Sequence, residues 1–122
     1  MTYWAKDRNL IEGSTPQQQF PKLLEEVIEL YATLHNDQGP EEITASIVDI
    51  VLGLQNKGKI KQALSNDPTD DIGDCGVVLT LIAEQHNLTI SSCLAHAYND
   101  IKDRKGMMID GVFVKETVIN SK

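Results

Sequence analysis

Apolar residues recur at helical spacing along almost the whole chain. Between residues 40 and 56, for example, Ile43, Ile47 and Ile50 are followed by Val51 and Leu54. Side chains three and four positions apart lie on one face of a helix, so this spacing predicts an amphipathic helix that turns one face to a core. A chain built mainly from such segments is expected to fold as a bundle of helices.

Helix-starting and helix-ending residues divide the chain into five predicted helices. We expect them at about residues 2–12, 15–35, 41–56, 68–85 and 89–106. Pro16 and Pro68 stand at or near first helical positions, which proline tolerates, whereas Pro21 is a point at which the second helix would bend. Gly13 is expected to end the first helix, and Gly106 is expected to be the left-handed cap of the fifth.

The C-terminal segment has a different pattern. Apolar residues at 107–109 and 112–114 flank Asp110-Gly111, and Asp-Gly between two apolar segments is typical of a two-residue hairpin turn. An isolated hairpin is only marginally stable, so we expect this one to pack on the helices or on a partner subunit. The predicted fold class is therefore all-α, a bundle of four to five helices with a short C-terminal β-hairpin.

Size and hydropathy limit the location of the protein. The chain has 122 residues, which suits a single domain over residues 1–122. No apolar run approaches the roughly 18 residues that cross a bilayer, and the first residues lack the apolar segment of a signal peptide. These features predict a cytoplasmic protein that contacts no membrane.

Net charge and cysteine content exclude further classes. The net charge is −7, which argues against nucleic acid as a partner because phosphate contacts need clustered Lys and Arg. An acidic chain can still bind a phosphorylated small molecule through a divalent cation. Cys75 and Cys93 lie in apolar helical segments without metal-type spacing, and we interpret them as buried free thiols.

The second predicted helix carries a cluster of glutamates. Its apolar face consists of Phe20, Leu23, Val27, Leu30, Tyr31 and Leu34. Glu25, Glu26 and Glu29 fill most of the remaining surface, and one interpretation is an ordinary solvated face. Against it, Glu25 and Glu29 are like charges four residues apart, which mildly destabilises a helix, and only Lys22 offers compensation nearby.

Two aspartates of the fourth predicted helix lie on its apolar stripe. Asp71 and Asp74 are three residues apart, with Val78 between them in angle. Placement in the first turn explains Asp70 and Asp71 as partners of the helix dipole, worth about 0.3–1 kcal/mol, but it does not explain Asp74. An ionised carboxylate that faces a core costs several kcal/mol unless it is paired or bound to a cation. Asp74 therefore indicates a cation or a basic partner.

The two acidic pairs together predict a metal site. If the second and fourth helices pack against each other, Glu26 and Glu29 converge with Asp71 and Asp74 on one oxygen-rich site. Oxygen ligands without Cys or His suit Mg²⁺, with Mn²⁺ as the alternative, rather than Zn²⁺. No glutamate has a histidine three residues further on, which disfavours a di-iron centre.

Polar and basic residues end the fifth predicted helix. Asn99 is followed by Lys102, Arg104 and Lys105. Ordinary pairing of cations with the helix dipole is one explanation. The functional interpretation is that Lys102, with Arg104 or Lys105, holds phosphate oxygens and stabilises charge that develops on them.

In this order, the motifs resemble the MazG-like superfamily of all-α nucleoside triphosphate pyrophosphohydrolases, which includes dimeric dUTPases and dCTP pyrophosphatases. The resemblance covers about residues 14–116. Residues 22–30 match the Glu-x-x-Glu helix of the family, and residues 71–74 stand in the place of its Glu-x-x-Asp. Asn99, Lys102 and Arg104 stand where the family has its Asn/Lys/Arg segment, and residues 104–115 are similar to the ending of small phage-type members.

The resemblance implies a Mg²⁺-dependent enzyme that hydrolyses (deoxy)nucleoside triphosphates to the monophosphate and pyrophosphate. The implied metal ligands are Glu26, Glu29, Asp71 and Asp74. Water attacks a phosphorus atom, assisted by the metal-bound carboxylate of Glu26, while Glu25 holds or deprotonates the water. Implied substrate contacts are Gln18 (or its neighbour Gln19), Lys22, Asn99, Lys102 and Arg104. Family members are dimers or tetramers, which implies a homodimer or homotetramer here.

Some positions depart from the family or allow two interpretations. The family usually has Glu at the position of Asp71, so this shorter side chain would act through water, or Asp70 would replace it. Residues 40–66 separate the two acidic motifs more widely than in the shortest members, and we interpret them as an added helix and linker that shape the base pocket or a subunit contact. Trp4 either packs against the protein or stacks on the nucleotide base.

Two further hypotheses remain open. In the first, the chain is a non-catalytic helical module that binds a nucleotide or a partner protein through the same surface. In the second, Asp71 and Asp74 are buried partners of Lys or Arg within an obligate oligomer. Base and sugar preference do not follow from the sequence, because helical periodicity does not locate the hydrogen-bonding groups of a pocket.

Overall fold

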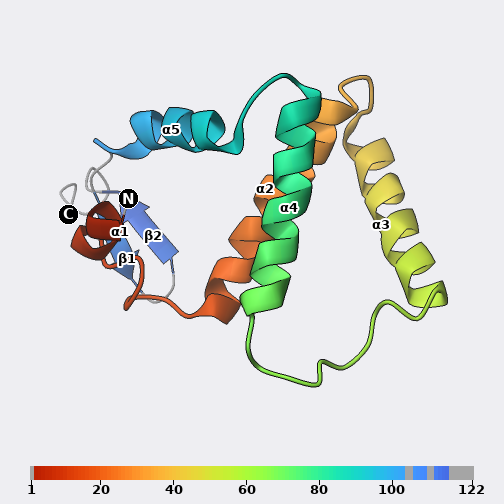
Figure 1. The fold of residues 1–122 in the computed structure, drawn as a ribbon, viewed down its shortest axis with the longest axis horizontal. Coiled ribbons are helices and arrows are strands. Elements are labelled where there is room, and N and C mark those ends of the chain that lie inside the picture. The colour runs from red at the N-terminus through yellow and green to blue at the C-terminus, as the bar shows by residue number, and fades with distance from the viewer. Residues whose placement is uncertain (1, 104–105, 110–111, 116–122) are drawn as a thin grey trace. The chain divides into compact units, whose positions relative to one another are not determined.

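The computed structural model describes residues 2–103, 106–109 and 112–115. Among them are five helices, which confirms the predicted all-α class: α1 (Thr2–Asp7), α2 (Pro16–Leu34), α3 (Pro40–Asn56), α4 (Thr69–Gln85) and α5 (Ile90–Ile101) (Figure 1). Two short strands follow, β1 (Gly106–Ile109) and β2 (Val112–Lys115). None of the helices in the described part of the chain is long and apolar enough to cross a membrane.

The described residues form two compact units. One contains Met1–Ser14 and Ser65–Lys122, and the other contains Thr15–Leu64. The first, the α4–α5 unit, holds α1, α4, α5 and both strands, and the second, the α2–α3 unit, holds the two remaining helices. The single domain expected over residues 1–122 stays a prediction.

Side-chain caps fix where α2 and α5 begin. The hydroxyl of Thr15 accepts a hydrogen bond from the backbone N–H of Gln18, whose side chain accepts from the N–H of Thr15 in return. Thr89 and Ser92 repeat this reciprocal arrangement at the start of α5. Such capping boxes satisfy N–H groups that the helix itself leaves without acceptors.

Three helices end in the same way, with a residue at positive φ. Asn9, Gly58 and Asn87 have φ of 55°, 73° and 58°. After α3, for example, the N–H of Lys59 donates to the carbonyl of Leu54, and the N–H of Gly58 donates to that of Gln55. These paired bonds define the Schellman motif, which stops a helix and satisfies its last carbonyls.

Two predicted helix ends were wrong. The first helix ends at Asp7 rather than near residue 12, because Asn9 takes the left-handed conformation and the N–H of Leu10 turns back to the carbonyl of Ala5. The fifth helix ends at Ile101, with Lys102 as its cap, and Gly106 begins β1 instead of capping the helix. Pro21 lies inside α2, which continues through it.

The two strands pair antiparallel, with Gly106 opposite Lys115 and Ile109 opposite Val112. They coincide with the apolar segments on either side of Asp110-Gly111, whose turn lies outside the described residues. In Figure 1 the pair lies beside α1. Two hydrogen bonds join β1 to the turn after α1. The N–H of Met108 donates to the carbonyl of Arg8, and the side-chain amide of Asn9 donates to the carbonyl of Met108.

Very little apolar surface is buried within the described chain. Only Ala83 and Met108 fall below one-tenth exposure among its residues. By contrast, Phe20 of α2 is 58% exposed, Ile50 of α3 is 51% exposed, and Val77 of α4 is 59% exposed. The expected apolar faces therefore exist on the helices, but a single chain leaves much of them uncovered.

Candidate functional site

Four predicted site residues share one face of α2. Lys22 lies 2.5 Å from a carboxylate oxygen of Glu25 and 3.2 Å from one of Glu26. Glu29 follows Glu26 by three positions, so its carboxyl lies next to that of Glu26 along the helix. All four side chains are exposed, and we call them the α2 acidic cluster. It combines three carboxyl groups with one ammonium group.

The carboxyl groups of the α2 acidic cluster do not ionise alike. A hydrogen bond from Lys22, followed by one from Glu29, lowers the pKa of Glu26 from its ordinary value. The same neighbour has the opposite effect on Glu29, whose pKa is raised mainly by its hydrogen bond to Glu26. The pKa of Lys22 is raised by its hydrogen bonds to Glu25 and Glu26. Glu26 therefore keeps its charge, and Glu29 is the group that takes up a proton most readily.

Two neighbouring carboxylates are a place where a cation is favoured. Glu26 and Glu29 repel each other when both are ionised, and either a proton or a metal ion relieves that repulsion. Because solvent and salt screen charges on an exposed helix, the effect of this pair alone is modest. Additional ligands from elsewhere are needed to complete a Mg²⁺ site.

Gln18, predicted to contact the nucleotide, has a structural role at the start of α2. Its side-chain oxygen accepts the hydrogen bond from Thr15 that closes the capping box. The side-chain NH2 group of Gln18 is therefore the part of this amide that can contact a ligand. Gln18 is one turn before Lys22 on the helix, so a donor at Gln18 and the α2 acidic cluster lie on adjoining turns.

The predicted aspartates of α4 are exposed and do not face a core within the α4–α5 unit. The least exposed side of α4 contains Gly76, Thr80 and Ala83, and α5 is the helix of this unit that contacts α4. Asp71 and Asp74 lie on the opposite side of the helix, since positions five and two residues before Gly76 are turned by roughly half a circle from it. The expectation that these carboxylates face a core is therefore wrong for this unit.

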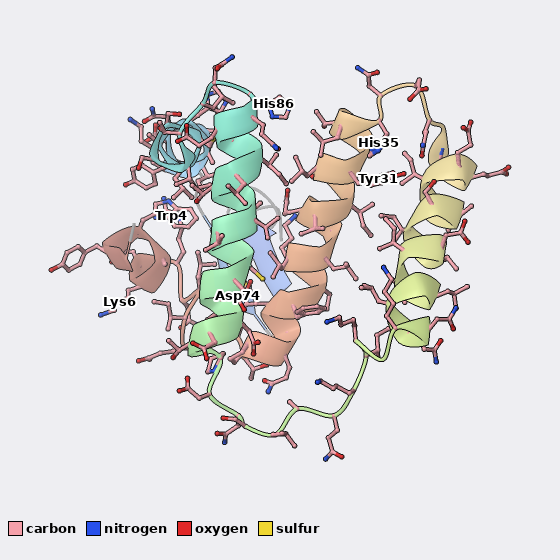
Figure 2. All side chains as sticks on the ribbon, turned by 45° about the vertical axis from the view of Figure 1, so that its right-hand side comes forward. Trp4, Lys6, Tyr31, His35, Asp74 and His86 are labelled. Carbon is pink, nitrogen blue, oxygen red and sulfur yellow. The ribbon has the colours of Figure 1, made fainter. Side chains whose placement is uncertain are left out.

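The outer side of α4 mixes carboxylates with apolar side chains. Val78 and Leu81 share this side with Asp71 and Asp74 and are 55% and 56% exposed. Within the described residues, neither aspartate has a hydrogen bond or ion pair from its side chain. Figure 2 shows Asp74 in the first half of α4. Two unpaired carboxylates on an apolar surface are an arrangement that favours a cation or a covering partner.

The four predicted metal ligands are divided between the two units. Glu26 and Glu29 belong to the α2–α3 unit, and Asp71 and Asp74 belong to the α4–α5 unit. No group of three or more His, Cys, Asp or Glu side chains suited to a metal ion occurs in the described part of the chain. Their convergence on one ion stays a prediction, as does the choice between Asp70 and Asp71.

The C-terminal end of α5 contains two of the three predicted phosphate contacts. Asn99 and Lys102 are exposed, and Arg104 lies outside the described residues. The carbonyl of Lys102 accepts a hydrogen bond from the indole N–H of Trp4 at 3.0 Å. Trp4 also has the guanidinium carbon of Arg8 4.6 Å from its ring centroid. These contacts favour the packing interpretation of Trp4.

The sequence did not predict a polar cluster at the corner between α2 and α3. The rings of Tyr31 and His35 are stacked, with centroids 4.0 Å apart and planes 19° apart (Figure 2). The hydroxyls of Tyr31 and Ser46 both donate to the side-chain oxygen of Gln38, at 3.2 and 3.4 Å. The four-residue spacing of Tyr31 and His35 was the available sequence signal. It was missed because Tyr31 was assigned to the predicted apolar face.

The cysteines are free thiols, but they are less buried than expected. Cys75 is exposed and Cys93 is intermediate. Cys75 lies next to Asp74 on α4, where α5 does not cover the helix. The prediction of free thiols is confirmed, and the prediction that both are buried is wrong.

Comparison with known proteins gives one relative. The chain is 35% identical over 85 residues to an "Uncharacterized 18.2 kDa protein in rep-hol intergenic region" of Haemophilus phage HP1 (strain HP1c1), a match that covers 70% of this chain and 36% of the relative. The chain therefore spans about a third of the length of that relative. No family model matches the sequence. No solved structure matches it either.

Proposed function

We propose that the protein is a Mg²⁺-dependent nucleoside triphosphate pyrophosphohydrolase of the MazG-like type. The observation that carries the proposal is the α2 acidic cluster, in which Glu26 and Glu29 share a hydrogen bond and their pKa values move in opposite directions. The unpaired Asp71 and Asp74 on the outer side of α4 supply the second half of the proposed ligand set. Mn²⁺ is the alternative ion.

The donor chemistry of these residues fits a hard divalent cation. All four proposed ligands are carboxylates, and neither Cys nor His is among them. When bound there, Mg²⁺ would neutralise charge on the triphosphate and lower the pKa of a coordinated water. Glu25, whose carboxylate lies 2.5 Å from the ammonium nitrogen of Lys22, is the proposed group that positions the attacking water. Lys22 contacts both Glu25 and Glu26, and it would have to leave these contacts to bind a phosphate.

The proposed phosphate contacts are Asn99, Lys102 and Arg104, with Gln18 near the nucleotide. Lys102 is an exposed cation at the end of α5, and an ammonium group binds phosphate oxygens as a point charge. Its place beside the last carbonyls of α5 also suits the helix dipole. A triphosphate supplies enough negative charge to compete with that local interaction.

We further propose that the enzyme is a homodimer or homotetramer. The large apolar side chains left exposed on α2, α3 and α4 exceed what an isolated soluble domain shows as scattered surface residues. Burying such faces between copies of the chain would supply the hydrophobic stabilisation that a single chain lacks.

The test of the proposed activity is a screen of pyrophosphate release from the eight common ribo- and deoxyribonucleoside triphosphates with Mg²⁺. We expect release of pyrophosphate and the monophosphate from at least one of them, and loss of turnover in Glu29→Gln. Glu84→Gln, which removes the same charge from an exposed position of α4, is the matched control and should keep activity. Absence of turnover for all eight nucleotides, with Mg²⁺ and with Mn²⁺, would contradict the proposal.

A second candidate, a non-catalytic helical module that binds a nucleotide or a partner protein, is favoured by the exposed apolar faces alone. The two candidates differ in their response to Mg²⁺. A Mg²⁺-dependent rise in melting temperature that Glu29→Gln abolishes supports the enzyme, because a ligand bound to the folded state stabilises it. An unchanged melting temperature in both proteins supports a protein-interaction module.

A further inference from the structure

The side chains of Trp4, in α1, and Arg8, just after it, both hydrogen-bond to one carbonyl group at the end of α5. The carbonyl of Lys102 accepts hydrogen bonds from the indole N–H of Trp4 at 3.0 Å and from the guanidinium of Arg8 at 2.8 Å. A carbonyl oxygen has two lone pairs, so these two donors satisfy it fully. Figure 2 shows Trp4 turned from α1 toward α5, whereas Lys6 points away.

Arg8 and Trp4 also contact each other directly. The guanidinium carbon of Arg8 lies 4.6 Å from the centroid of the Trp4 ring, and a second nitrogen of Arg8 donates to the Trp4 carbonyl at 3.4 Å. A planar guanidinium that stacks on an indole while donating in its own plane is a preorganised arrangement that Lys does not reproduce. We call Trp4, Arg8 and the Lys102 carbonyl the α1 clasp.

The turn after α1 also bonds to β1. The carbonyl of Arg8 accepts from the N–H of Met108, and the side chain of Asn9 donates to the carbonyl of Met108. Met108 is one of the two buried apolar residues in the described chain, at 8% exposure. Consecutive residues of one turn, Arg8 and Asn9, therefore bond on either side of the stretch between Lys102 and Met108.

The α1 clasp uses the carbonyl of Lys102, whose ammonium group is a proposed phosphate contact. Lys102 provides its carbonyl to the clasp, and its side chain is exposed. Fixing the backbone of Lys102 in the free protein lowers the entropy cost of placing the ammonium group on an anion. The positive charge of Arg8 is already committed to the carbonyl end of α5, where the helix dipole favours it.

We propose that the α1 clasp positions the C-terminal end of α5 for anion binding, with Arg8 as a positioning residue and a polyphosphate as the ligand. This inference rests on the proposed function, because it takes Lys102 as a phosphate contact. It adds a role for α1, which lies outside the segments that carry the acidic motifs. The residues it links are far apart in sequence: Arg8 and Lys102 are separated by 94 positions along the chain.

The test measures the affinity of the full chain for inorganic pyrophosphate in the presence of Mg²⁺, by calorimetric titration. We expect Arg8→Gln to weaken binding by about tenfold, the effect of losing one charge-assisted hydrogen bond that orders the site. Lys6→Gln is the matched control, because it removes the same charge two residues before Arg8, at an exposed position of α1 that points away from α5. It should change the affinity by less than about twofold, as expected for a screened surface charge.

Arg8→Lys separates positioning from direct charge contact. If Arg8 acted on the anion through its charge, Lys would preserve the affinity, whereas positioning predicts that Arg8→Lys binds as weakly as Arg8→Gln. Trp4→Phe, which keeps an aromatic face for Arg8 but removes the indole donor, should fall between the wild type and Arg8→Gln. Melting curves for each variant identify the temperature at which all of them are folded, and binding is measured there.

The outcomes distinguish this inference from the proposed activity. With a hydrolysed nucleotide, Arg8→Gln should raise KM and leave kcat nearly unchanged. Wild-type affinity for pyrophosphate in Arg8→Gln would overturn the clasp even if the enzyme is active, and so would a wild type that binds no pyrophosphate. Arg8-dependent pyrophosphate binding without hydrolysis of any nucleotide would support the clasp and refute the proposed activity.

As a second readout, the only tryptophan of the chain is a member of the clasp. Its emission should shift when pyrophosphate and Mg²⁺ are added, because the charge and order around the indole change. The shift should disappear in Lys102→Gln and persist in Lys6→Gln. A shift of equal size in Lys102→Gln would contradict the coupling between Lys102 and the clasp.

Discussion

Opposite pKa shifts in neighbouring carboxyl groups are the strongest residue-scale sign of chemistry in this chain. The hydrogen bond from Lys22 lowers the pKa of Glu26, whereas the pKa of Glu29 is raised mainly by its hydrogen bond to Glu26. The presence of this cluster was predictable, since the spacing of the residues places them on one face of a helix. The unequal ionisation was not predictable, because it depends on which oxygen atoms Lys22 reaches.

The first prediction concerns the pH dependence of metal binding. The pKa of Glu29 is raised above its ordinary value of 4.5, so its proton competes with Mg²⁺ at a higher pH than an isolated glutamate would. Mg²⁺ affinity should be full well above this pKa and should fall as the pH drops through it. Titrations with Mg²⁺ across the acidic range measure the effect, and Glu29→Gln should weaken binding and remove this transition. A wild-type affinity that is constant across the transition would contradict the role of Glu29.

The stability contributions of the same pair have opposite signs. Because the folded-state pKa of Glu29 is raised, its small contribution favours the folded state below the unfolded pKa and is lost as pH rises through the folded pKa. Glu26, whose pKa is lowered, contributes above its unfolded pKa and loses that contribution as pH falls through the folded value. Both groups are exposed, so pH should change Mg²⁺ binding far more than it changes the melting temperature.

At the scale of elements, caps explain which parts of the fold the sequence predicts. Thr15 before Pro16, and Thr89 before Ile90, locate helix starts because their hydroxyls accept N–H groups that have no other partner. The end of α1 was missed because Asn9 adopts the left-handed conformation with nothing in its neighbours to set it apart from other asparagines. The hydrogen bond between Trp4 and Lys102 spans 98 positions, and helical periodicity carries no information on contacts at that range.

The second prediction uses two glycines of the α3 region that have opposite roles. Gly58 has φ of 73° at the helix end, and no atom lies near an added Cβ. Gly58→Ala should therefore destabilise the fold by about 1 kcal/mol through backbone strain alone. Gly53 lies inside α3 with open space around it, so Gly53→Ala should stabilise by about 0.5–1 kcal/mol. Thermal unfolding of both variants measures the two signs, and equal signs would contradict the assigned end of α3.

At the scale of the whole molecule, many large apolar side chains remain partly exposed in the described chain. The amphipathic pattern predicted which helix positions are apolar, but it did not predict what covers them. The pattern also placed Asp71 and Asp74 on an apolar stripe, and the α4–α5 unit leaves that stripe on the outer side of α4. A periodic sequence identifies faces, whereas the choice of partner for each face depends on the assembly.

The third prediction is that the protein assembles in solution through these faces. Sedimentation analysis at micromolar concentration should give a particle larger than one chain. Leu81→Glu places a charge at a 56% exposed position of α4, where a monomer would tolerate it within about 0.5 kcal/mol. In an interface it should dissociate the particle or lower its stability sharply. Gln85→Glu adds the same charge at an exposed polar position of the same helix and should have no effect. A monomeric wild type would contradict the prediction.

We propose that Glu29 of α2 and Asp74 of α4 both contribute to binding one Mg²⁺. Pyrophosphate release as a function of Mg²⁺ concentration tests it most directly, in the wild type, Glu29→Gln, Asp74→Asn and the double variant. If the two residues share one ion, each single variant should lose most of the activity, and the double variant should lose little more, because residues that act on one site are not additive. Independent losses that simply multiply in the double variant, or full activity in Asp74→Asn, would contradict the claim.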